Sequence, residues 1–113
     1  MESETTQLEV CRRFAADPET PAAGTKLGVA ANVRSETVPL HGLRHPPEGD
    51  TNGWYLWRGE YSDDPDFFVP LHVEHVGEWA PEAIPYLALP PGWRFLTAPG
   101  HEDIWFDATL LEI

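Results

Sequence analysis

The most suggestive chemical grouping in this sequence is a pair of histidines with carboxylates nearby. His72 and His75 lie three positions apart, and on a helix that spacing puts both imidazoles on one face. Zinc takes histidine and carboxylate ligands, so Glu78 and Glu82 could complete a site there. The pattern is not HExxH, and no third ligand stands at a diagnostic spacing. The alternative is an ordinary pair of solvent-facing or packed histidines, so the sequence indicates at most a weak metal site.

Nucleophilic chemistry has less support in the residue pattern. Ser35 and Ser62 are not set in the strand–turn–helix elbow that a GxSxG motif forms. Cys11, the single cysteine, falls on a predicted helix, with only Arg12 and Arg13 near it in sequence to activate its thiol. The more ordinary role for this residue is packing on a half-buried helix face. We therefore predict that the protein is not an enzyme and uses no cofactor.

An acidic turn is the third candidate. Asp63, Asp64 and Asp66 surround a proline directly after an aromatic stretch. A calcium-binding EF-hand loop spreads its ligands over about twelve residues, with glycine at the sixth and glutamate at the twelfth, and that pattern is absent. Besides a divalent-ion site, two interpretations apply. The turn is either a solvated one in which aspartates cap the backbone, or a negative projection for a partner rich in lysine or arginine.

The charge balance of the whole chain narrows the classes of partner. Its 113 residues include 19 acidic and 7 basic ones, which gives a formal net charge of −12. Nucleic acids and anionic membranes are bound by clustered lysine and arginine, so neither is an expected partner. The acidity either keeps the protein dispersed or steers it toward a basic protein. The polar N-terminus, the lack of a membrane-length apolar run and the single cysteine lead us to expect a cytoplasmic protein.

Helical and strand patterns predict one small domain behind an N-terminal segment. A helix over residues 5–16 is expected to stop at the Asp-Pro pair that follows it, and residues 1–23 are assigned to this helix and a linker. Residues 24–113 are assigned to a single α+β domain. Its strands are expected at residues 26–33, 54–58, 93–98 and 104–107.

The segments between these strands are predicted to be loops and short helices. Residues 34–52, rich in proline and glycine, are interpreted as a long loop that includes Arg44 and His45. Two prolines rule out one long helix, so short ones are expected at 72–79 and 81–88. The resulting fold is α+β: a small, mainly antiparallel sheet of about four to five strands with two or three short helices packed on it.

The strand at residues 54–58 is aromatic on both sides. Alternation turns Trp54 and Leu56 to one side and Tyr55 and Trp57 to the other. One side is expected to face the core. The other is either covered by a loop or helix, or presented to a partner.

Two stretches of the chain resemble the immunity protein 33 family. Residues 50–66, DTNGWYLWRGEYSDDPD, resemble its Asp-Ser-Gly-Trp turn, aromatic strand and acidic Tyr-x-Asp-Asp-Pro-Asp segment. Residues 80–95, APEAIPYLALPPGWRF, resemble its Pro-x-Ile-Ile-Pro-x-Leu segment and the Pro-x-Gly-x-x-Phe beyond it. The resemblance covers about residues 24–107. The chain departs from the family in a longer loop at residues 34–49 and in Ala80, which stands where the family has aspartate.

The resemblance implies a role in a bacterial toxin–immunity system, in which members bind and silence a cognate toxin, although some members are stand-alone proteins of unknown role. It thus implies a non-catalytic partner for a protein toxin, one that the acidity of this chain suggests has a basic surface. We expect the contact surface to include Trp57, Tyr61, Asp63, Asp64, Asp66, Arg44 and His45. The alternatives are a small metal-dependent or hydrolytic enzyme that uses His72 and His75, and an accessory interaction module without a toxin.

Overall fold

The computed structural model describes residues 2–62 and 64–112, with side chains from residue 6 onward. It has an α+β fold, as predicted, with six strands in one sheet rather than four or five. The strands in chain order are β1 (Lys26–Ala30), β2 (Leu40–Arg44), β3 (Thr51–Arg58), β4 (Phe68–His72), β5 (Trp93–Ala98) and β6 (His101–Phe106).

The sheet is mainly antiparallel, which confirms the prediction. Its spatial order is β4-β1-β3-β2-β5-β6, and β1 and β3 form the one parallel pair among these described strands. The chain leaves β1 through a 3₁₀ turn and returns as β2, and β3 then fills the place between them. A two-residue turn, Pro99 and Gly100, joins β5 to β6, and Gly100 takes a φ of 74° that suits glycine.

The helical segments are short apart from the first. They are α1 (Glu2–Arg13), η1 (Ala31–Arg34), η2 (Val73–His75), α2 (Val76–Trp79), η3 (Pro81–Tyr86) and η4 (Ala108–Leu111). The predicted break at Pro81 is confirmed: this proline opens η3, and Pro85 inside η3 keeps it in the tighter 3₁₀ form. Within the described part of the chain, none of the helices combines the length and the apolar character that crossing a membrane requires.

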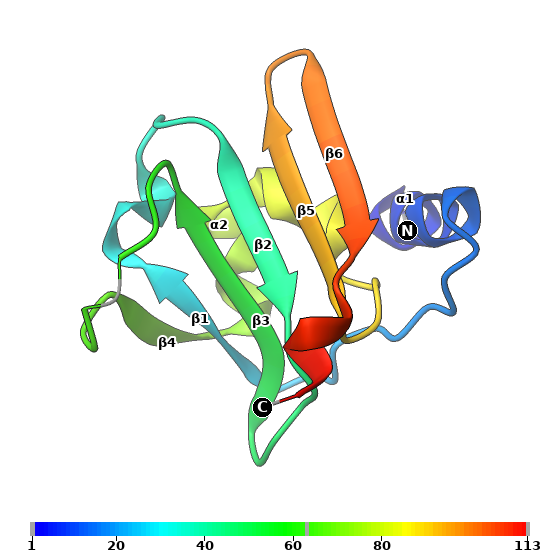
Figure 1. The fold of residues 1–113 in the computed structure, drawn as a ribbon, viewed down its shortest axis with the longest axis horizontal. Helices are drawn as coiled ribbons and strands as arrows, with labels where there is room; N and C mark the ends of the chain where they lie inside the picture. The colour runs from blue at the N-terminus through cyan, green and yellow to red at the C-terminus, as the bar shows by residue number, and fades with distance from the viewer. Residues whose placement is uncertain (1, 63, 113) are drawn as a thin grey trace.

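The helical segments α2 and η3 lie on one face of the sheet, behind the strands in Figure 1, and α1 packs against η3 beside the β6 edge. The core between these layers contains Trp54 of β3 and Phe95 of β5, both fully buried. Helix α1 adds Val10 and Cys11 to the same core, and burial raises the pKa of the Cys11 thiol. The predicted N-terminal segment thus shares its apolar contacts with the sheet.

The prediction of one long loop over residues 34–52 is wrong, because this range contains β2, a strand in the middle of the sheet. Sequence analysis missed this strand because it is only five residues long, with Gly42 at its centre and Arg44 at its end, and glycine and arginine are not typical of a central strand. Gly42 is required because the Phe95 ring lies directly over it, and a Cβ at this position would collide with that ring.

β4 is the second strand that the pattern did not predict. We expected His72 to begin a helix after Pro70, whereas His72 is the last residue of β4. β4 lies at the edge of the sheet and pairs with β1. A proline is tolerated at such an edge because no neighbouring strand needs its missing N–H group. β6 likewise begins at His101, three residues earlier than predicted.

Candidate protein-binding surface

The sheet face opposite the helices is largely uncovered, and we call it the open face. It faces the viewer in Figure 1, with the short η4 near one end of it. Strand alternation and cross-strand register place on this face the side chains of His41, Leu43, Tyr55, Trp57, Phe68, Leu96 and Trp105. An uncovered apolar face on a globular protein is typical of an interaction site.

Aromatic contacts join much of the open face into one cluster. The aromatic cluster consists of His41, His45, Tyr55, Trp57, Tyr61, Phe67 and Phe68. Trp57 is at its centre: its ring stacks on His41 with centroids 4.9 Å apart, and Tyr61 meets it edge-on at 5.5 Å. Trp57 is only 4% exposed, whereas Tyr61 is 57% exposed. Of these two predicted contact residues, Tyr61 is therefore the one that a partner can touch directly.

His41 carries little positive charge within this cluster at neutral pH. Burial, and next the charge of Arg94, lower the pKa of His41 from its ordinary value of 6.5, although a hydrogen bond with the backbone of Gly59 opposes them. At pH 7 the ring is accordingly neutral and stacks on Trp57 as an uncharged aromatic. His41 was not among the predicted residues, because its contact with Trp57 depends on β2, which the sequence pattern did not reveal.

The acidic turn (residues 60–66) borders the aromatic cluster. The Asp64 N–H donates to the Ser62 hydroxyl at 3.1 Å, and the Asp66 N–H donates to Asp64 Oδ1 at 2.8 Å. The second of these bonds is the capping of a turn by aspartate, which was one of the interpretations that the sequence left open. Asp64 and Asp66 are both exposed, so their negative charge is also available to a partner. The predicted residue Asp63 lies outside the described residues.

Arg44 does not lie in a loop, contrary to the prediction, because it is the last residue of β2. His45 lies in the short loop that follows this strand. Arg44 points into the core and is 1% exposed; its guanidinium donates to the carbonyls of Asn52 at 3.0 Å and Leu89 at 2.9 Å. It is thus occupied in stabilising the fold. His45 is half-buried on the open face, where its Nδ1 lies 2.9 Å from the Leu110 carbonyl.

The predicted histidine pair is brought together only loosely. His72 ends β4 and His75 ends η2, so the two do not share a helix, and their ring centroids are 6.4 Å apart. His75 Nδ1 lies 3.3 Å from Glu78, while Glu82 forms an ion pair with Arg58 at 2.9 Å. Among the described residues, no group of three or more histidine, cysteine, aspartate or glutamate side chains is arranged to hold a metal ion.

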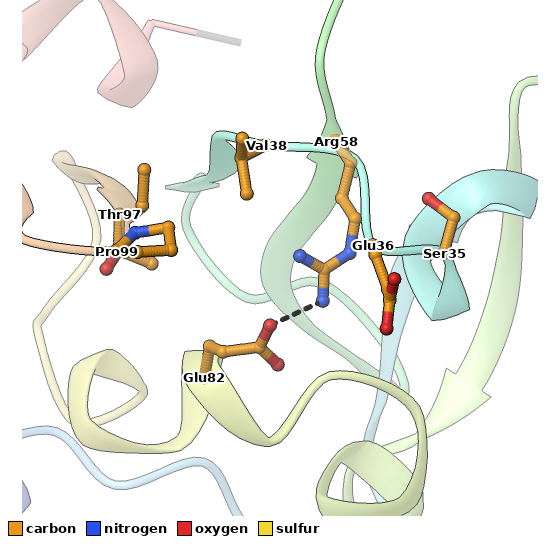
Figure 2. A pocket seen from close by; sticks show the side chains of 8 residues that line it. Ser35, Glu36, Val38, Arg58, Glu82, Thr97 and Pro99 are labelled. Atoms are coloured by element: carbon orange, nitrogen blue, oxygen red, sulfur yellow. Dashed lines mark hydrogen bonds and ion pairs between the residues drawn. The ribbon is translucent and has the colours of Figure 1, made fainter.

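A hollow of about 450 Å³ opens beside η1 and the β5–β6 turn (Figure 2). Its size falls in the range of small-molecule sites, roughly 300–1,000 Å³. Its one cation, Arg58, donates from Nε to the Val33 carbonyl at 2.7 Å and from Nη2 to Glu82. Ser35 Oγ accepts the Thr37 N–H at 3.2 Å. Arg58 therefore holds η1 and η3 to the sheet, whereas the Ser35 bond stays within one loop, and a structural role explains both.

Comparison with known proteins gives one match. A family model described as the Imm33-like domain matches residues 6–107, from within α1 to the residue after β6. No curated protein and no solved structure matches the chain.

Proposed function

Because the chain belongs to the Imm33-like domain family, as the resemblance predicted, we propose that it is an immunity protein that neutralises a protein toxin by binding it. The observation that carries the proposal is the open face, where the aromatic cluster, with buried Trp57 at its centre and exposed Tyr61 at its surface, adjoins the acidic turn. A steric or electrostatic block needs such a complementary surface and no chemistry of its own.

The open face has the two properties that a protein partner requires. Tyr61 offers a large ring held in place by Trp57 and Phe68, and tyrosine is enriched among the residues that dominate binding energy. The exposed carboxylates of Asp64 and Asp66, within a chain of net charge −12, would attract a toxin with a basic surface. The aromatic contacts would slow dissociation of the complex, and the negative charge would speed association.

The first test is growth of a bacterial host that expresses each reading frame beside this gene, with and without this chain. We expect one frame to stop growth, this chain to restore it, and the toxin to be recovered from the complex intact and active. Intact toxin after dissociation distinguishes blocking from destruction. A toxin that is cleaved or modified by this chain would contradict a non-catalytic role. If no neighbouring frame is toxic, the accessory-module alternative replaces the proposal.

The second test measures the association rate of the complex as a function of salt. The double variant Asp64→Lys, Asp66→Lys should associate about tenfold more slowly at low salt, with a flatter salt dependence. The matched control is Glu9→Lys, Asp17→Lys, which changes two exposed acidic residues at the α1 side of the molecule, by the opposite sheet edge. Each replacement removes one negative charge and adds one positive charge, so two replacements raise the net charge of either variant by four, from −12 to about −8. Equal association rates for the two variants would show that the acidic turn is not part of the contact surface.

A further inference from the structure

We propose that a cavity on the open face receives a lysine or arginine side chain of the protein partner. The cavity has a volume of about 200 Å³ and is lined by Leu43, His45, Tyr55, Tyr61 and Phe68. The inference rests on the proposed function, since it names the group on the toxin that this surface recognises.

The size of the cavity selects a single side chain. Pockets that hold a whole small molecule measure roughly 300–1,000 Å³, and this cavity is smaller than that range. Its floor is the sheet itself, because Leu43 and Tyr55 are cross-strand partners in β2 and β3. Its remaining walls come from His45, from Tyr61 in the segment that joins β3 to β4, and from Phe68, the first residue of β4.

The walls are aromatic and suit a cation. The Tyr55 and Phe68 rings meet edge-on with centroids 5.1 Å apart, the Tyr61 and Phe68 centroids are 6.2 Å apart, and His45 meets Tyr55 edge-on at 5.6 Å. Aromatic faces attract ammonium and guanidinium groups through the ring quadrupole, and several rings around one site form a cage for such a group. A long basic side chain also places its methylene groups against the apolar wall formed by Leu43.

Five of the seven lysine and arginine residues of the chain are stacked or paired outside the cavity. Four arginines lie over aromatic rings outside the cavity: Arg13 over Phe14, Arg34 over Trp79, Arg44 over Trp54 and Arg94 over Trp105. The single lysine, Lys26, pairs with Asp50 at 3.1 Å. The protein thus uses arginine on aromatic rings repeatedly, and the cavity rings are left for a cation from outside.

Charge around the cavity favours a basic occupant over an apolar one. The acidic turn contains Tyr61 and ends two residues before Phe68, so it is adjacent in sequence to two residues that line the cavity. Asp64 and Asp66 are exposed within this turn. An apolar partner side chain would gain only from burial, whereas a lysine or arginine gains from the rings and from these carboxylates together.

The test is a titration of the whole protein, followed by NMR signals of the Tyr55, Tyr61 and Phe68 rings. The probes are the Nα-acetyl amides of lysine and arginine, compared with that of norleucine, whose side chain has the four carbons of lysine but lacks the ammonium group. We expect the basic amides to bind about threefold to thirtyfold more tightly than norleucine amide. The Tyr61→Leu variant should lose this preference. The control Trp105→Leu, which alters a ring on the same face outside the cavity, should keep it.

Equal binding of norleucine and lysine amides, or no shift of the cavity rings with any probe, would overturn the proposal. So would an unchanged preference in Tyr61→Leu. These outcomes are independent of growth rescue. A toxin that is neutralised although the amides do not bind would contradict the cavity alone, whereas amides that bind when no toxin is neutralised would contradict the proposed function alone.

Discussion

Replacing the buried Arg44 with methionine tests how the middle of the sheet is held to the helical layer. Its guanidinium donates to the carbonyls of Asn52 at 3.0 Å, Glu19 at 2.6 Å, Leu89 at 2.9 Å and Leu87 at 3.4 Å. The Glu19 carboxylate lies 3.8 Å away and is half-exposed. Burial lowers the pKa of Arg44 and the Glu19 charge opposes this. Arg44→Met keeps a comparable length and removes all of these donors.

The loss in the free energy of unfolding depends on how many carbonyl oxygens the substitution leaves without a hydrogen-bond donor. The Leu87 carbonyl keeps a hydrogen bond from the Trp54 indole at 3.0 Å, and Glu19 is exposed, so water can reach its carbonyl. The carbonyls of Asn52 and Leu89 lose the arginine donors. At about 1–3 kcal/mol for each buried acceptor left without a donor, the two account for about 2–6 kcal/mol. Methionine avoids burying a charge, which offsets part of that loss and leaves a destabilisation of about 2–4 kcal/mol.

Urea unfolding followed by tryptophan fluorescence measures this loss, because Trp54 lies beside Arg44 in the core. The control is Glu19→Gln, which removes only the half-exposed ion pair and should cost less than about 1 kcal/mol. An Arg44→Met variant as stable as the control would refute the argument. It would mean that water or a rearranged backbone satisfies the carbonyls of the core.

Two further predictions concern the same core. Burial, and next the Glu102 carboxylate that accepts the Tyr86 hydroxyl at 2.6 Å, raise the pKa of Tyr86 from 10 to about 12. Because the folded pKa is the higher one, this stabilisation is complete below pH 10 and is lost as the pH rises to 12, by about 2–3 kcal/mol. Stability curves of wild type and Tyr86→Phe should therefore converge over that window, and parallel curves would contradict the assignment. Gly42→Ala should destabilise by about 1–3 kcal/mol because its methyl group meets the Phe95 ring, whereas Gly77→Ala, where a Cβ meets only the end of Ile84 at 3.4 Å, should be close to neutral in chemical denaturation.

Sequence analysis predicted correctly those features that depend only on the residues of a single strand or turn. Alternation in β3 correctly separates Trp54 and Leu56 from Tyr55 and Trp57, and Pro81 correctly marks the break between helical segments. The spacing of aspartates predicts the capped turn that Asp64 forms. Each of these features depends on contacts between residues close together in the chain.

The rest depends on contacts between distant residues. β2 is recognisable only once Phe95 is seen to cover Gly42, and Arg44 is a core residue only because carbonyls from three other segments surround it. Sequence analysis also predicted Trp57 as a contact residue, because it could not show that Tyr61 and His41 pack over its ring. The open face itself was foreseen only as one of two options for the second side of the strand at residues 54–58.

The most direct test of the central claim is growth of a host that expresses the cognate toxin together with single-residue variants of this protein. Tyr61→Arg places a charge on the open face, and Leu8→Arg makes the same change at an exposed apolar residue of α1, on the helical side. The account predicts that wild type and Leu8→Arg restore growth and that Tyr61→Arg, although folded and present at an equal level, does not. Equal rescue by both variants would show that the toxin is not bound at the open face.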